Sequence, residues 1–105
     1  YKFAVSSVTE RIEALLKRNS LTIDDISRVL LHQANMRINA SAVNRLGGGE
    51  DKFPHNIERY GNTSSATIPV LLDELHKQGK LHRGDRIVLA GFGAGLTIGA
   101  CVMTW

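Results

Sequence analysis

Segments with the apolar spacing of a helix alternate with short apolar runs of strand length along this chain, and this alternation restricts the fold most strongly. Val8, Ile12 and Leu16 recur at every fourth position and predict an amphipathic helix over residues 3–17. Two further helices are predicted over residues 36–46 and from Ser64 or Ser65 to Gln78. The predicted strands cover residues 29–31, 53–60, 86–90 and 96–105.

The order of these elements predicts an α/β fold. Strands that alternate with helices form a parallel sheet, and the two consecutive strands at the end of the chain form an antiparallel pair at its edge. We therefore expect a small mixed, mostly parallel sheet with helices packed against it. Glycines at 47–49 and at Gly79 end the second and third helices, and Thr22 predicts a cap before a short helical turn.

The length and composition are those of one soluble globular domain, which we assign to residues 1–105. Hydrophobic residues make up 43% of the chain and charged residues 22%, which excludes a disordered or fibrous protein. The net charge of +3 is spread along the sequence, so we expect a solvated surface and no nucleic-acid partner. Because the chain begins with Tyr1 rather than Met, we expect it to be part of a longer polypeptide.

The sequence predicts neither a membrane partner nor a metal site. The apolar runs have strand length, and no secretion signal is recognisable, so we expect a cytoplasmic protein. Cys101 is the single cysteine, and inside an apolar strand it is more often a core thiol than a nucleophile. His55, His76 and His82 lack the spacing of metal ligands and are expected at the surface.

Polar or glycine-rich residues follow three of the predicted strands, where α/β proteins bind ligands. These segments are residues 32–35, 61–64 and 91–95. Taken alone, His32 is more often a structural histidine than a catalyst, and Asn62 has the composition of a helix cap. The glycine loop does not have the GxGxxG spacing of a dinucleotide site. A histidine and an asparagine at neighbouring strand ends, however, supply two donors that can stabilise an oxyanion.

Three motifs in order resemble the C-terminal part of the β-ketoacyl-acyl-carrier-protein synthase III family, which are condensing enzymes of the thiolase fold. The motifs are HQANMRI at 32–38, YGNTSSATIP at 60–69 and GFGAGLT at 91–97, and the resemblance extends over essentially the whole chain. It implies the C-terminal half of a thiolase-like fold. It also implies that this chain lacks the first strand of that half, at the centre of the sheet.

The resemblance implies a decarboxylative Claisen condensation that initiates fatty acid synthesis. An acyl group from coenzyme A is loaded on a cysteine and transferred to malonyl-acyl-carrier protein. No cofactor is required, since the coenzyme A thioester is a substrate. The implied partners are acyl-coenzyme A, the acyl carrier protein, the N-terminal half of the same polypeptide and a second copy in a homodimer.

The resemblance also assigns roles at the reacting centre. His32 and Asn62 match the catalytic histidine and asparagine, which donate hydrogen bonds to the malonyl thioester oxygen as enolate charge develops. Phe92 matches a phenylalanine that crowds the malonyl carboxylate. Gly93 and Ala94 match a turn whose backbone N–H binds the tetrahedral oxyanion at the acyl-cysteine.

Three further residues match positions that bind substrate. Asn35 matches a contact to the pantetheine arm, and Arg37 and Arg45 resemble basic positions that meet the carrier protein or the coenzyme A phosphates. Cys101 does not match the nucleophile, which belongs to the N-terminal half of the family. We therefore expect the isolated chain to be inactive in condensation.

Three alternatives stay open at this point. The first is a synthase III-like acyltransferase or condensing enzyme of polyketide or other secondary metabolism. The second is a non-catalytic module that binds an acyl carrier, which the intact His32 and Asn62 disfavour. The third is a small nucleotide-binding α/β domain, although the chain has no phosphate loop.

Overall fold

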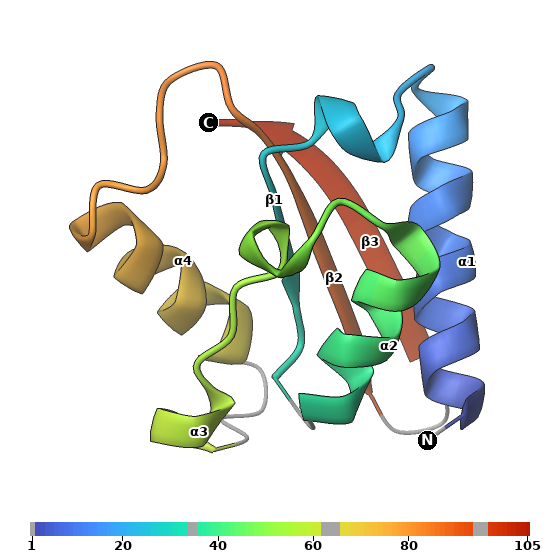
Figure 1. The fold of residues 1–105 in the computed structure, drawn as a ribbon, viewed down its shortest axis with the longest axis horizontal. Coiled ribbons are helices and arrows are strands. Elements are labelled where there is room, and N and C mark those ends of the chain that lie inside the picture. Colours follow the sequence, from blue (N-terminus) through green and yellow to red (C-terminus); the bar gives the residue numbers. More distant parts are fainter. Residues whose placement is uncertain (1, 34–35, 62–65, 94–96) are drawn as a thin grey trace.

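The computed structural model describes residues 2–33, 36–61, 66–93 and 97–105, and a mixed sheet lies at its centre (Figure 1). Its strands are β1 (Arg28–Leu31), β2 (Arg86–Gly93) and β3 (Thr97–Thr104), in the order β1-β2-β3. β1 runs parallel to β2, with Leu30 opposite Leu89, and β2 runs antiparallel to β3. The predicted α/β class, mixed sheet and antiparallel edge pair are confirmed.

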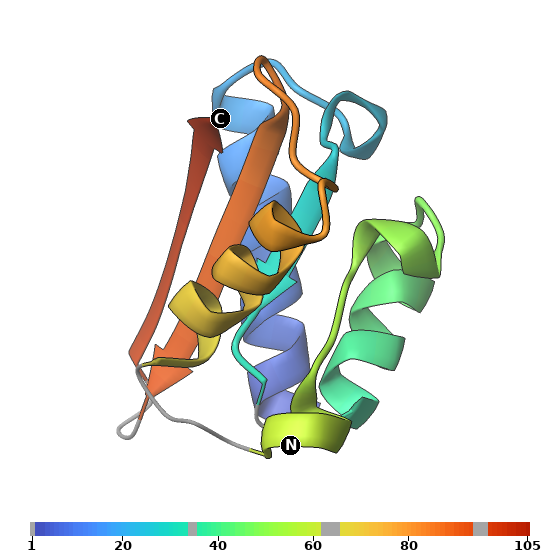
Figure 2. The same ribbon diagram turned by 90° about the vertical axis from the view of Figure 1, so that its left-hand side faces the viewer.

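Helices cover both faces of the sheet, α1 and α2 on one face and α4 on the other (Figures 1 and 2). The helices are α1 (Lys2–Arg18), α2 (Met36–Leu46), the short α3 (Ile57–Tyr60) and α4 (Thr67–Lys77). The helices predicted over residues 3–17 and 36–46 match α1 and α2 within one residue at each end, and the third predicted helix matches α4. The three-layer arrangement explains why the strands are apolar on both faces.

Alternate residues of each strand enter two separate apolar clusters. On one face, Val29 of β1 and Val88 of β2 pack with Ile12 of α1, and all three side chains are fully buried. On the other face, Leu30 and Ile87 pack with Leu71 of α4. Because successive strand residues point to opposite faces, each strand ties the two helical layers together.

The strand predicted over residues 53–60 is wrong. Phe53 is buried, but the segment continues through Pro54 into the helical turn α3, and the described sheet has three strands rather than four. Pro54 has no N–H for a strand ladder, and Gly61 ends the turn with a φ of 66°. Tyr60 is 54% exposed, so the segment also lacks the alternating burial of a strand.

The gap expected at the centre of the sheet is absent from the described strands. β1 and β2 are directly hydrogen-bonded neighbours, and so are β2 and β3. A further strand could therefore join only along the outer edge of β1 or of β3.

The last two strands depart from the prediction in two ways. β2 continues three residues past Ala90, because Phe92 pairs with Ile98 and Gly93 with Thr97. Cys101 is exposed on β3, so its assignment as a core thiol is wrong. Met103, on the same face of β3, packs against the apolar cluster that contains Leu30, Ile87 and Leu71 of α4. Cys101 lies outside this cluster.

The predicted helical stops are confirmed. Gly47 and Gly79 follow α2 and α4 with φ values of 81° and 71°, which only glycine adopts readily. The turn Ile23–Asp25 begins after Thr22, whose backbone N–H donates to Oδ2 of Asp25 at 2.8 Å. This hydrogen bond lowers the pKa of Asp25.

We expect Gly79→Ala to lower the free energy of unfolding by about 1 kcal/mol in urea titrations. A Cβ at Gly79 would meet no atom within 4 Å, so the cost comes from the left-handed backbone alone. Gly99→Ala is the matched control, since Gly99 is equally open and its φ is not positive. Equal destabilisation by both substitutions would contradict this account.

Candidate active site

The carboxyl ends of β1 and β2 lie at one end of the molecule, where α2 and α4 begin (Figure 1). Parallel pairing produces this arrangement, because it puts the ends of both strands at the same edge of the sheet. Helix N-termini carry unpaired N–H groups and a partial positive charge. This edge of the sheet is therefore suited to bind a substrate in which negative charge develops.

His32 and Phe92, two of the predicted site residues, meet at this edge. The backbone N–H of His32 donates to the carbonyl of Ala90 at 3.0 Å, which continues the β1–β2 pairing by one residue. The rings of His32 and Phe92 stack, with centroids 4.8 Å apart and an angle of 23° between their planes. Stacking uses the face of the imidazole and not its in-plane nitrogens, so it orients the ring without consuming a donor.

Gln33, the residue that follows His32, fixes the chain at the end of β1 through hydrogen bonds. This role was missed in the sequence analysis. The side chain of Gln33 is buried, and its Nε2 donates to the carbonyl of Leu31 at 2.7 Å. Its Oε1 accepts the backbone N–H of Asn56 at 3.3 Å, and its own backbone N–H donates to Oγ1 of Thr67 at 3.1 Å. Gln33 thereby joins the end of β1 to the start of α3 and to the start of α4.

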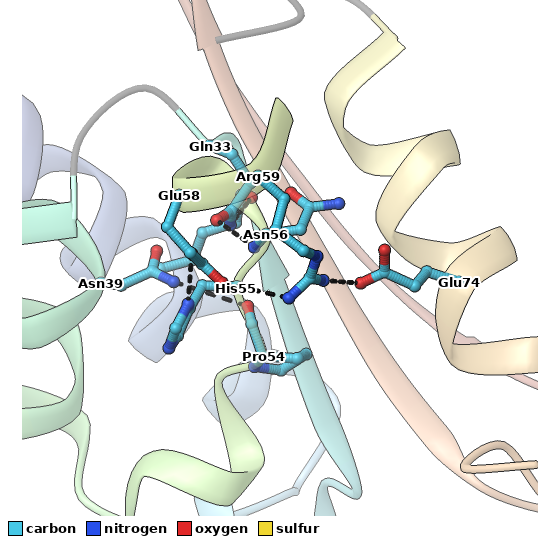
Figure 3. A network of polar contacts seen from close by, with 9 residues as sticks. Gln33, Asn39, Pro54, His55, Asn56, Glu58, Arg59 and Glu74 are labelled. Carbon is cyan, nitrogen blue, oxygen red and sulfur yellow. Dashed lines mark hydrogen bonds and ion pairs between the residues drawn. The ribbon is translucent and has the colours of Figure 1, made fainter. Parts of the chain in front are cut away.

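Polar contacts around α3 extend this network (Figure 3). Nδ2 of Asn39, on α2, donates to the carbonyl of Pro54 at 3.5 Å. Nδ1 of His55 lies 2.8 Å from Oε2 of Glu58, and this hydrogen bond lowers the pKa of Glu58. Arg59 pairs with Glu58 at 3.2 Å and also with Glu74 of α4.

The structure separates the two arginines expected to bind the carrier protein or coenzyme A. Arg37 is exposed in the first turn of α2, and this helix begins at the end of the molecule where β1 and β2 end. Arg45 lies in the last turn, roughly 12 Å along the helix axis. Its guanidinium pairs with Glu13 at 3.4 Å and Glu10 at 3.8 Å on α1, so its charge is already balanced.

Three predicted site residues, Asn62, Asn35 and Ala94, lie outside the described residues. Gly93 is described as the last residue of β2 and is exposed next to Phe92. In the described ranges, no group of three His, Cys, Asp or Glu residues is close enough to hold a metal ion. His55, His76 and His82 are exposed, as predicted.

None of the described helices is long and apolar enough to cross a bilayer.

Comparison with known proteins decides the family. Residues 16–105 match the sequence family described as 3-oxoacyl-[acyl-carrier-protein (ACP)] synthase III C terminal. This chain belongs to that family. The resemblance inferred from the motifs at 32–38, 60–69 and 91–97 is confirmed.

Curated relatives of the synthase III family match over the whole chain. The β-ketoacyl-[acyl-carrier-protein] synthase III of Clostridium novyi is 44% identical over 105 residues, which are 100% of this chain and 32% of that protein. The chain therefore spans about a third of the length of the curated relatives that it matches.

Solved structures confirm the thiolase-like fold. The β-ketoacyl-[acyl carrier protein] synthase III of Thermus thermophilus matches with a TM-score of 0.95 and 42% identity, over 99% of this chain and 32% of that one. A priming β-ketosynthase from the R1128 polyketide biosynthetic pathway matches with a TM-score of 0.90 and 35% identity, over 98% and 31%.

We expect Gln33→Leu to destabilise the protein by about 2 kcal/mol or more, because it leaves the buried N–H of Asn56 and carbonyl of Leu31 without these partners. The free energy of unfolding measures this loss. Gln78→Leu is the control, since Gln78 is exposed at the end of α4 and its replacement should change stability by about 0.5 kcal/mol at most. Similar values for both variants would show that Gln33 does not hold the site.

Proposed function

We propose that this chain supplies the oxyanion-binding part of a β-ketoacyl-[acyl-carrier-protein] synthase III. The complete protein would transfer an acyl group from acyl-coenzyme A to its own cysteine and condense it with malonyl-acyl-carrier protein, which initiates fatty acid synthesis. The observation that carries the proposal is His32, held at the carboxyl edge of the sheet and stacked on Phe92. We assign the nucleophilic cysteine to a part of the protein outside residues 1–105.

His32 and Asn62 act on the malonyl group in this proposal. The bond between the malonyl α-carbon and its carboxylate breaks, carbon dioxide leaves, and the electron pair forms an enolate on the thioester. Both side chains donate hydrogen bonds to the enolate oxygen, where the charge develops. The enolate carbon then attacks the acyl-cysteine carbonyl, which forms the carbon–carbon bond and a tetrahedral oxyanion. Collapse of this oxyanion restores the carbonyl and expels the cysteine thiolate.

Phe92 has two roles in the same step. Its ring orients the imidazole of His32 through the stack at 4.8 Å. It also gives the malonyl carboxylate an apolar neighbour, and an apolar environment favours the loss of that charge as neutral carbon dioxide. A backbone N–H at Gly93 or Ala94 binds the tetrahedral oxyanion, and Asn35 contacts the pantetheine arm of the substrate.

The substrates reach this site as phosphopantetheine thioesters carried by coenzyme A and by the acyl carrier protein. Arg37 is the better placed of the two arginines to meet their phosphates or an acidic carrier surface, because it is exposed at the start of α2. Arg45 contributes less in this proposal, since it lies in the last turn of α2, away from this edge of the sheet. We further propose a homodimeric, cytoplasmic enzyme.

The isolated 105-residue chain lacks condensation activity in this proposal. Its one thiol, Cys101, is exposed on β3 and pairs in register with Leu89, towards the middle of β2 rather than at the carboxyl edge. Formation of β-ketoacyl-carrier protein by the isolated chain, at the rate of the complete enzyme, would overturn this assignment.

A second candidate is a priming synthase of polyketide metabolism. The 35% identity to the R1128 priming β-ketosynthase favours it, and the chemistry assigned to His32 and Asn62 would be the same. A competition assay that offers malonyl-carrier proteins of the fatty acid and polyketide pathways together distinguishes these two candidate functions. The carrier protein with the faster condensation is the natural one.

In the complete enzyme, we expect His32→Ala or Asn62→Ala to slow condensation by roughly 100- to 1000-fold while acylation of the cysteine continues, because the donors act on the malonyl oxygen. Release of carbon dioxide measures the decarboxylative condensation, and intact mass spectrometry measures acylation of the cysteine. His82→Ala, at an exposed histidine, should leave both steps unchanged. Equal loss of both steps in His32→Ala would refute the assigned role.

A further inference from the structure

We propose that Thr67 is a positioning residue whose hydroxyl holds the end of β1, and with it the oxyanion donor His32, against the start of α4. The inference rests on the condensing function proposed above. It adds a residue that touches neither the substrate nor the reacting atoms and acts through the backbone beside His32.

The hydroxyl of Thr67 accepts a hydrogen bond from the residue next to His32. Oγ1 of Thr67 lies 3.1 Å from the backbone nitrogen of Gln33, and both residues are 2% exposed. A buried backbone N–H requires a partner, and β2 does not provide one here, because successive N–H groups of an extended chain point to opposite sides and that of His32 already bonds β2. Thr67 supplies the partner on the side away from β2.

This bond completes a set of three contacts that flank the His32 backbone. The N–H of His32 is held by Ala90 at 3.0 Å, and the side chain of Gln33 returns to the carbonyl of Leu31 at 2.7 Å. The bond from Gln33 to Thr67 is the contact of the three that reaches another helix. Loss of the hydroxyl would leave the strand end anchored to β2 and to the start of α3, but without this polar contact to α4.

Thr67 is also the first residue of α4. The next residue of α4, Ile68, packs against β2, since a Cβ at Gly91 would lie 3.6 Å from its Cδ1. The first turn of α4 therefore contacts both strands that present the site.

The placement of two donors around one oxygen is sensitive to small shifts. Hydrogen bonds weaken steeply with distance and angle, and a displacement of about 1 Å at a catalytic group can reduce the rate by roughly 100-fold. A hydroxyl that joins the end of β1 to α4 is thus expected to affect the step that needs His32. Acylation of the cysteine does not need this donor.

Thr67→Val in the complete enzyme tests the inference, because valine keeps the shape of threonine and removes the hydroxyl. We expect kcat for condensation to fall by on the order of 10- to 100-fold, with the KM for malonyl-carrier protein and the rate of cysteine acylation changed by about twofold at most. Thr67→Ser keeps the hydroxyl and should restore most of kcat. Thr104→Val, at an exposed threonine of β3, is the matched control.

Wild-type kcat in Thr67→Val would overturn the inference, and so would equal loss of both steps or failure of Thr67→Ser to restore condensation. Thr67→Ala removes the same hydroxyl and is assayed in the same way if Thr67→Val does not fold. Unfolding of both variants would show a purely structural role and would also overturn the inference. Absence of condensation by the wild-type enzyme would instead count against the proposed function itself.

Discussion

The parallel pairing of β1 with β2 is the constraint on which the rest of this structure depends. It joins segments that lie nearly sixty residues apart, with Leu31 opposite Ala90, and so brings His32 and Phe92 to one edge of the sheet. The helices between the two strands are the crossover that such a parallel pair requires. Without this pairing, the motifs at 32–38 and 91–97 would have no common site.

The sheet holds its position because apolar layers cover both of its faces. Val29 and Val88 face α1, whereas Leu30 and Ile87 face α4, and all four side chains are fully buried. A small shift of either helical layer is therefore resisted by the opposite one through the strands. The polar contacts of Gln33 then fix the strand end against α3 and α4.

The sequence predicted the elements with strong periodicity and missed those decided by distant contacts. The helix at 36–46 and the strand at 29–31 follow from local spacing and from the glycines that end the helix. Residues 53–60 contain isolated apolar side chains, such as Ile57 and Tyr60, whose spacing does not distinguish a strand from a loop that leads into a helical turn. His32 was found because the motif around it resembles a family. Gln33 and Thr67 were missed because their hydrogen bond joins residues 34 positions apart, which no local pattern reveals.

The central claim is that this chain provides the donors of a condensing site and not its nucleophile. Peptide mapping by mass spectrometry after incubation with short acyl-coenzyme A thioesters tests it most directly, on the complete protein and on the isolated 105-residue chain in parallel. The account predicts a retained acyl group on a cysteine outside residues 1–105 in the complete protein, and none on the isolated chain. An adduct on Cys101, or a folded complete protein that retains no acyl group, would contradict it.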